Sequence, residues 1–231
     1  MLAIQITTTY FNGTFDDVRF SGIVSFYITL TVFLALSAYV GEHVDRQNFL
    51  NRLRSEALQA KLLTLSETDA LTGLANRRVL DRLRTEIWAG EERAVSAILL
   101  DVDGYKSFND IYGHLEGDAC LRRISELVCR LVGEEGTVVR YGGEEILVLL
   151  PGAALARARG LAEDIRGAIE QLAVPHGGSK YGVVTASLGV ASASTTTHSM
   201  ERLLSQSDAA LYEAKRSGRN AVREHAVEAA Y

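Results

Sequence analysis

The sequence predicts an α/β domain with a mixed central β-sheet and helices on both faces, preceded by one transmembrane helix and a linker helix. Beyond residue 67, short apolar runs typical of strands alternate with longer helical patterns, and a Gly-Gly pair separates two adjacent strand-like runs. An uncharged stretch lies near the N-terminus. The expected organisation is a short tail at 1–21, a membrane span at 22–40, a linker helix at 41–66 and the α/β domain at 67–231.

The expected span, Gly22 to Val40, contains nineteen residues and no charged side chain. At about 1.5 Å of rise per residue it would extend about 28 Å as a helix, which matches the hydrocarbon core of a bilayer. A buried core helix and a signal peptide are the alternatives, although a basic n-region is lacking. Arg19 alone precedes the span, whereas three arginines follow it closely, which places the C-terminal side inside the cell.

Residues 41–66 lack proline and carry leucines among charged residues, which predicts an exposed helix that continues from the span. Leu50, Leu53, Ala57 and Ala60 fall at the a and d spacing of a coiled coil, but over fewer than the three or four heptads that would establish one. A dimerising signalling helix and a simple spacer both remain open. The tail at 1–21 is too small to fold alone.

Within the α/β domain, helical and strand-like patterns follow one another in a clear order. The predicted elements are a helix at 76–88, a strand at 97–102, a helix at 117–131, strands at 137–141 and 146–150, a helix at 153–172, a strand at 182–191, a helix at 200–215 and a strand at 221–223. Because one hairpin is combined with helical connections, the sheet is expected to be mixed, with helices covering both faces.

The overall charge and the cysteines exclude several classes of function. A net charge of -5 argues against a general nucleic-acid binder, since such proteins need excess Lys and Arg to neutralise phosphates. A nucleotide could still be held by a few local cations and a metal ion. Cys120 and Cys129 lack the spacing of a zinc site or of a disulfide framework, so we expect them to pack as apolar side chains in a reduced compartment.

Two acidic residues follow the apolar run 97–100. Asp101 and Asp103 stand where open α/β sheets place ligands, at the carboxyl end of a strand, and strand alternation sends both to one face. Mg²⁺ prefers one or two carboxylates together with substrate phosphates, and this pair could supply them. A solvated turn or a helix cap is the alternative.

Two further acids follow a predicted tight turn. Gly142-Gly143 is typical of a two-residue type I′ hairpin, in which both central residues have positive φ, and Glu144 and Glu145 come next. If this hairpin lies beside Asp101, four carboxylates converge, and their repulsion would raise pKa values or require a bound cation. A purely structural hairpin with a solvated tip is the alternative.

Five stretches together resemble the motif series of bacterial GGDEF-domain diguanylate cyclases, here with a Gly-Gly-Glu-Glu-Ile variant. The resemblance covers about residues 67–223, in the order of the family. The matching stretches are Asp69-Ala-Leu-Thr-Gly-Leu-Ala-Asn-Arg-Arg78, Asp101-Val-Asp-Gly-Tyr-Lys-Ser-Phe-Asn-Asp110, Gly113-His-Leu-Glu-Gly-Asp118, Arg140-Tyr-Gly-Gly-Glu-Glu145 and Ala214-Lys-Arg-Ser-Gly-Arg-Asn220.

The resemblance implies a nucleotidyl-cyclase palm-like fold and a Mg²⁺ or Mn²⁺ site. Asp101 and Glu144 would bind the metal with help from the Val102 carbonyl, and Glu144 would also accept the proton of the attacking 3′-hydroxyl. Glu145 would support the metal cluster. For Asp103, a direct metal ligand and a residue that hydrogen-bonds to one remain comparable possibilities.

The resemblance also implies a set of substrate-binding residues. Asn109 and Asp118 match the guanine-binding pair, and a carboxylate can accept from guanine donors that adenine does not offer together. His114 matches a substrate contact, although a turn histidine packed on its neighbours is an alternative. The positions that match phosphate-contacting residues are Lys106, Lys215 and Arg219. Basic residues late in the last helix could equally complement its dipole.

The activity implied is the condensation of two GTP molecules, across a two-fold homodimer, into cyclic di-GMP and two pyrophosphates, for bacterial signalling. The protein would cross the inner membrane once, with the catalytic domain in the cytoplasm. A non-catalytic GTP-binding or protein-interaction module and a membrane-tethered interaction protein are the alternatives.

The sequence departs from the family pattern at three places. Ile146 stands where phenylalanine is usual, and Gly104-Tyr105 where His-Phe is common. The inhibitory Arg-x-x-Asp pattern is replaced by Gly133-Glu-Glu-Gly136, so we expect no inhibitory product site.

Overall fold

A computed structural model describes residues 1–11, 13, 17–65, 67–89 and 92–225 of the chain. It contains two compact units, Met1–Leu65 and Ser66–Tyr231, which we describe separately. Small parts of three predicted segments lie outside the described residues: 12 and 14–16 in the tail, 66 in the linker, and 90–91 and 226–231 in the domain.

The N-terminal unit consists of α1 (Leu2–Phe11) and the 49-residue α2 (Asp17–Leu65). One continuous helix therefore runs through both the predicted span and the predicted linker. Its segment Phe20–Glu56 is long and apolar enough to cross a membrane, with a mean hydropathy of 2.0 in its most apolar window, and none of that window is buried against protein. Exposed apolar side chains such as Phe26 and Phe33 are what a lipid environment would accept.

The second unit is built on a six-stranded sheet with the strand order β1-β3-β4-β2-β5-β6. The β1–β3 and β5–β6 pairs are parallel and the other neighbours are antiparallel, so the predicted mixed sheet is confirmed. The strands are β1 (Ala75–Asn76), β2 (Ala94–Val102), β3 (Thr137–Arg140), β4 (Glu145–Pro151), β5 (Ala186–Ser194) and β6 (Val222–Glu224).

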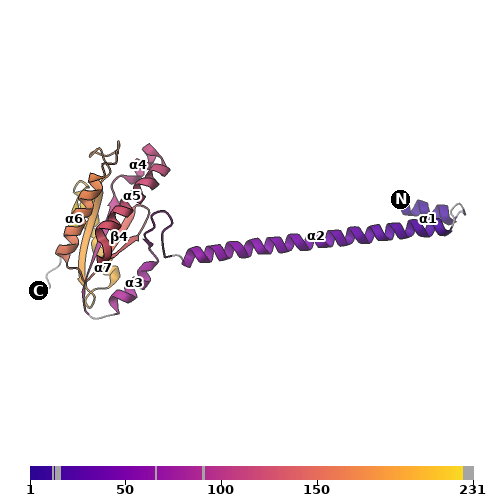
Figure 1. Cartoon of the computed structure of the whole chain (residues 1–231), viewed down its shortest axis with the longest axis horizontal. Coiled ribbons are helices and arrows are strands. Elements are labelled where there is room, and N and C mark those ends of the chain that lie inside the picture. The colour runs from indigo at the N-terminus through magenta and orange to yellow at the C-terminus, as the bar shows by residue number, and fades with distance from the viewer. Residues whose placement is uncertain (12, 14–16, 66, 90–91, 226–231) are drawn as a thin grey trace. The chain divides into compact units, whose positions relative to one another are not determined.

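Helices cover both faces of the sheet, as predicted (Figure 1). The helices of this unit are α3 (Val79–Trp88), α4 (Tyr105–Tyr112), α5 (His114–Val132), α6 (Leu155–Gln171) and α7 (Met200–Arg216), with a short 3-10 helix η1 (Gly133–Glu135). Alternate residues of β2 divide between the two layers, because successive side chains on a strand point to opposite faces. Ile98 and Leu100 pack with α5 and α6, whereas Leu99 packs with α3 and α7.

Several predicted boundaries differ from the structure. The helix predicted from 76 begins at Val79, because Ala75 and Asn76 pair with β3 as strand β1. The strand predicted from 182 begins at Ala186, and the helix predicted from 117 begins at His114. Helix α4 was not predicted, because it has only eight residues and a single buried side chain, Phe108, which is too short a pattern to recognise.

Candidate active site

The centre of the candidate site is the C-terminal end of β2, the strand between β4 and β5. Asp101 pairs with Glu145 of β4 on one side and with Ser187 of β5 on the other, so the hairpin does lie beside the Asp101 strand. The Asp101 residue is 9% exposed. Its Oδ2 atom lies 2.8 Å from the Lys215 ammonium at the end of α7. Four predicted site residues therefore meet at this point: Asp101, Glu144, Glu145 and Lys215.

The charges around Asp101 are not balanced. Burial raises the pKa of the Asp101 carboxyl, and the negative charges of Glu144 and Glu145 raise it further, while Lys215 opposes both effects. Because the net shift is upward, the single ammonium does not fully compensate burial and the two neighbouring acids. A divalent cation would restore that balance, so the residues present fit a metal ion.

The predicted convergence of four carboxylates is nevertheless incomplete. Among the described residues, no three His, Cys, Asp or Glu side chains lie close enough together to hold a metal ion as they stand. Asp103 is engaged by Thr185 and Ser187, and one of the two oxygens of Asp101 contacts Lys215.

The glycine turn before the two glutamates differs from the prediction. The prediction of a two-residue type I′ turn was wrong, since neither Gly142 nor Gly143 has positive φ. Instead, the Tyr141 and Gly142 amides both donate to the Glu145 carbonyl, at 2.9 and 3.3 Å, and three residues lie between Tyr141 and Glu145. A Cβ atom at Gly142 would lie 2.5 Å from Glu145 Oε2, so this glycine leaves room for the carboxylate.

A partly buried ion pair holds this wider turn in place. The Arg140 guanidinium donates to the Gly143 carbonyl at 2.8 and 3.2 Å and to both oxygens of Asp69 at 2.8 and 3.0 Å. Hydrogen bonds from Arg140 and Thr72 lower the pKa of Asp69, outweighing the upward effect of burial. Asp69 and Arg140 lie within the stretches that carry the family resemblance, but their contact could not be read from the sequence.

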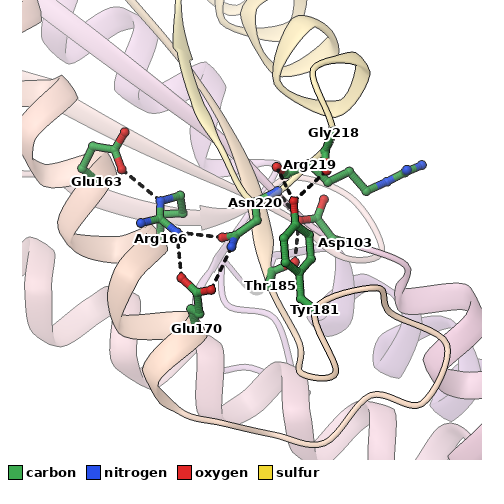
Figure 2. Close-up of polar contacts among 9 residues, drawn as sticks. All are labelled: Asp103, Glu163, Arg166, Glu170, Tyr181, Thr185, Gly218, Arg219 and Asn220. Carbon is green, nitrogen blue, oxygen red and sulfur yellow. Dashed lines mark hydrogen bonds and ion pairs between the residues drawn. The ribbon is translucent and has the colours of Figure 1, made fainter.

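Asp103 belongs to a second, fully hydrogen-bonded network (Figure 2). Its Oδ2 atom accepts from the Thr185 hydroxyl at 2.8 Å and from the Asn220 amide at 2.9 Å, and its Oδ1 atom accepts from the Ser187 hydroxyl at 2.7 Å. The residue is 5% exposed. Its donors come from β5, from Thr185 just before β5 and from the turn after α7, so Asp103 ties these segments to the end of β2.

The turn after α7 is held from two sides (Figure 2). Gly218, Arg219 and Asn220 all have positive φ, at 113°, 66° and 45°. The Asn220 side chain accepts from Arg166 at 2.8 Å and donates to Glu170 at 3.0 Å, both on α6. Such strained backbone persists only where surrounding contacts enforce it. The conformation of this turn is therefore set by α6 and Asp103 together.

The predicted guanine-binding residues come from neighbouring helices, Asn109 from α4 and Asp118 from the start of α5, and both lie near Tyr105. Asn109 is partly buried, and its Oδ1 atom is buried without a hydrogen-bond partner among the described residues. Burial and the charge of Asp118 raise the pKa of Tyr105, whose hydroxyl also contacts Asn109, so these three side chains share one environment. A buried acceptor without a donor is costly, and a ligand N–H group would satisfy it.

Three further predicted site residues have exposed side chains, whereas the side chain of Val102, predicted to act through its carbonyl, is buried. Lys106 and His114 are exposed at the start of α4 and of α5, and Arg219 is exposed in the turn after α7. At the end of β2 the structure thus brings together Asp101, Glu144, Glu145 and Lys215. Ser187, Thr185 and Asn220 were not predicted as site residues, although Asn220 ends the last of the matching stretches.

The arrangement of acids, polar base site and cations at the end of a central strand is that of a nucleotide-binding enzyme domain. Residues 66–221 match the family described as "Diguanylate cyclase, GGDEF domain", and the chain belongs to this family.

Known relatives support the same assignment. Diguanylate cyclase VdcA of Vibrio cholerae is 41% identical over 176 residues, which make up 75% of this chain and 50% of the relative. An uncharacterized membrane protein of Staphylococcus saprophyticus, SSP1970, is 30% identical over 226 residues, or 95% of this chain and 58% of the relative. The chain spans about half the length of the curated relatives it matches.

A solved structure shows the same fold. The coiled coil and GGDEF domain of DgcB from Caulobacter crescentus, crystallised in complex with c-di-GMP, is 29% identical to this chain. The two share a TM-score of 0.63 over 80% of this chain and 97% of that one. The α/β fold class predicted from the sequence is therefore confirmed.

Proposed function

We propose that this protein is a diguanylate cyclase, which condenses two GTP molecules into cyclic di-GMP and releases two pyrophosphates. The observation that carries the proposal is the pairing of Asp101 with Glu145 across β2 and β4, which gathers buried and unbalanced negative charge at the end of the central strand. The family match and the diguanylate cyclase relatives agree with this activity.

In this proposal, each domain binds one GTP. Asp118 accepts from the N1–H and N2–H₂ groups of guanine, and the buried Asn109 oxygen gains the donor it lacks. The triphosphate is neutralised by nearby cations, where point charges and a guanidinium fork suit phosphate oxygens. The cations assigned to this role are Lys106, Lys215 and Arg219.

A divalent cation, Mg²⁺ or Mn²⁺, would be held by Asp101, Glu144 and the Val102 carbonyl, and when bound would neutralise phosphate charge and acidify a nearby hydroxyl. The Lys215 ammonium then leaves Asp101 and pairs with the triphosphate. Asp103 positions the turn after α7 through its three hydrogen bonds, and Glu145 adds negative charge beside Asp101.

The reaction proceeds by displacement at phosphorus. Glu144 accepts the proton of the 3′-hydroxyl, and the 3′-oxygen forms a bond to the α-phosphorus of the GTP held by the partner subunit. The bond from that phosphorus to the bridging oxygen breaks, and pyrophosphate leaves with its electrons. Two such steps close the ring, so a homodimer is required and positioning dominates the catalysis.

We further propose a single-pass protein of the bacterial inner membrane with a cytoplasmic catalytic domain. The apolar segment Phe20–Glu56 and the membrane-protein relative support membrane attachment, and the arginines after the apolar stretch support the orientation. Protease treatment of right-side-out and inverted vesicles tests this. The catalytic domain should be cleaved in inverted vesicles alone, and cleavage in right-side-out vesicles would contradict the orientation.

The activity is tested with the full chain in detergent or nanodiscs. Incubation with GTP and Mg²⁺ should yield cyclic di-GMP and pyrophosphate by mass spectrometry, and chelation of the metal should stop the reaction. Absence of product from a folded dimer that binds GTP would refute the cyclase and favour a non-catalytic GTP-binding module.

The loop at Gly133–Gly136 supports one regulatory prediction. It forms η1 and carries the ion pair between Glu135 and Arg157 in place of an arginine-aspartate pair. We therefore expect added cyclic di-GMP to leave the initial rate unchanged. Inhibition that disappears when residues 133–136 are replaced would contradict this prediction.

A further inference from the structure

A cavity of about 350 Å³ lies between the loop before β5, the start of α4 and the turn after α7. It adjoins the candidate site, because Asp103 lines it and is two residues from Asp101. The residues that line it are Asp103, Gly104, His176, Gly178, Ser179, Lys180, Tyr181 and Arg219. Two of these, Lys180 and Arg219, are cations.

The cavity has excess positive charge. Neither Lys180 nor Arg219 has an ion-pair partner within the described part of the chain, and both side chains are exposed. The one acidic residue of the cavity, Asp103, directs its two oxygens to Thr185, Ser187 and Asn220. An anion would therefore meet a net positive charge here, since two cations outnumber one carboxylate, at the edge of the proposed triphosphate site.

A single tyrosine positions both cations. The Tyr181 hydroxyl donates to the Gly218 carbonyl at 2.8 Å and contacts the Arg219 carbonyl at 3.2 Å, so it holds the backbone from which Arg219 extends (Figure 2). The Lys180 ammonium lies over the Tyr181 ring, 4.9 Å from its centroid. Gly218 leaves space for this ammonium, since a Cβ atom there would lie 3.3 Å from Lys180 Nζ.

The start of α4 contributes to the same cavity. Gly104 has a φ of 69° and precedes α4, whose N-terminus has no side-chain cap. The buried His176 fills the adjoining space, because its Nε2 atom would lie 3.1 Å from a Cβ at position 104. Glycine is thus favoured here both by its positive φ and by the close approach of His176.

We infer that Lys180 is a further substrate-contacting residue, which acts with Arg219 on the terminal phosphate of GTP. The inference rests on the proposed function for the path of the nucleotide. The base lies at Asn109 and Asp118, and the reacting α-phosphate lies at Asp101 and Glu144. The cavity is lined by Arg219, which follows the phosphate-contacting Lys215 by four residues at the end of α7, so the end of the triphosphate would reach it and Lys180 binds the part of GTP that becomes pyrophosphate.

The test compares nucleotides with and without the terminal phosphate. The full chain is titrated with 3′-deoxy-GTP and 3′-deoxy-GDP in the presence of Mg²⁺, because these analogues lack the attacking hydroxyl and cannot be turned over. Lys180→Met should weaken binding of 3′-deoxy-GTP by about 10-fold, as expected for one charge-assisted contact, and that of 3′-deoxy-GDP by less than about twofold. Lys180→Arg should retain most of the affinity for the triphosphate.

A control variant distinguishes a direct contact between Lys180 and the nucleotide from a general effect of removing one positive charge. Arg130→Met removes one exposed positive charge at the far end of α5 and should change neither affinity. Equal weakening of both nucleotides by Lys180→Met, or no change in either, would overturn the inference. If the wild-type chain binds 3′-deoxy-GTP but makes no cyclic di-GMP from GTP, the proposed activity fails, while the role of Lys180 is still decided by the binding data.

Titration with inorganic pyrophosphate distinguishes a subsite for the nucleotide from a general anion site. Weaker pyrophosphate binding in Lys180→Met, together with the selective loss for the triphosphate, supports the inference. A loss for pyrophosphate without any loss for 3′-deoxy-GTP would mean that the cavity takes free anions only, which overturns it.

Discussion

Asp101 and Asp103 lie two residues apart at the end of the same strand and are both nearly buried, yet their surroundings are opposite. Asp103 accepts three hydrogen bonds from uncharged donors, and no acidic side chain is among its described contacts. Asp101 has one ammonium at 2.8 Å and the charges of Glu144 and Glu145 nearby. The Asp103 carboxyl is fully hydrogen-bonded, whereas the one ammonium beside Asp101 does not fully compensate its burial and the two neighbouring acids.

In the proposed mechanism, this difference separates a positioning residue, Asp103, from a metal ligand, Asp101. A buried carboxyl with complete hydrogen bonding stabilises the segments that it joins. A buried carboxyl whose pKa is raised by burial and by neighbouring acids lowers stability in its charged form, and such residues concentrate at functional sites. The two aspartates would thus respond differently to substitution, to pH and to metal.

The largest effect is expected at the acids beside Asp101. Glu144→Gln removes the proposed proton acceptor and metal ligand, so formation of cyclic di-GMP should fall at least about 100-fold. The free energy of unfolding should not decrease, because Glu144 makes no hydrogen bond in the described structure that the amide would lose. Product formation measured by mass spectrometry checks this.

The matched control is Glu134→Gln, which changes an exposed acid in η1. The strand that follows η1 is β3, and β4 lies between β3 and β2 in the sheet. It should leave the rate unchanged. Full activity in Glu144→Gln would remove this residue from the catalytic assignment.

Asp103 should instead show its effect in stability. Asp103→Asn replaces one acceptor oxygen by a donor that faces hydroxyl and amide donors, and should lower the free energy of unfolding by about 2 kcal/mol. Urea unfolding followed by the fluorescence of Trp88 measures this, since Trp88 is the single tryptophan and its indole donates to His198. Asp110→Asn, on the exposed face of α4, is the control and should change the free energy by less than about 0.5 kcal/mol.

The contrast between the two aspartates could not be predicted from the sequence. Alternation correctly indicated one face for both, and the motif series indicated a shared metal role. The partners of Asp103 that separate them lie 82, 84 and 117 residues away in the chain. No local pattern contains such contacts, so whether Asp103 is a ligand or a positioning residue had to stay open.

Local patterns were sufficient where one element carries its own signal. The long apolar run of β2 and the β3–β4 hairpin were predicted nearly at their observed positions. The prediction of a type I′ turn was wrong because a side chain helps to set the shape of the observed turn. Arg140 binds the Gly143 carbonyl and also Asp69, which lies 71 residues earlier in the chain. Turn chemistry read from Gly-Gly alone cannot include that contact.

The next smaller effect concerns the far side of the hairpin. Ile146 follows Glu145 but faces the opposite layer, where it is fully buried with Leu100 and the α5 and α6 side chains. Ile146→Phe adds volume to this layer and should lower the free energy of unfolding by about 1 to 3 kcal/mol. The rate per folded molecule should stay within about threefold of the wild type, because the acids lie on the other face.

Urea unfolding and initial rates measured on the same preparations test this separation. Ile146→Val serves as the matched control for lost rather than added volume, and should cost about 1 kcal/mol. A large rise in activity with phenylalanine would mean that isoleucine alters the position of the acids, and that the two faces of β4 are coupled.

The smallest effect is the pH dependence of Asp101 in metal-free protein. Its folded pKa is raised above the ordinary value of 3.8 by burial and by Glu144 and Glu145, so the folded state holds this proton more tightly than the unfolded state. The resulting stabilisation is complete below the unfolded pKa and is lost as pH rises through the folded pKa.

Asp101→Asn removes this dependence of the free energy of unfolding on pH. With chelator present, its free energy of unfolding relative to wild type should therefore be more favourable at pH 7 than at pH 4, and Mg²⁺ should cancel the advantage by stabilising only the wild type. A wild type that is more stable than Asp101→Asn at pH 7 without metal would show that Lys215 compensates the charge of Asp101, and the distinction between the two aspartates would then lie in geometry alone.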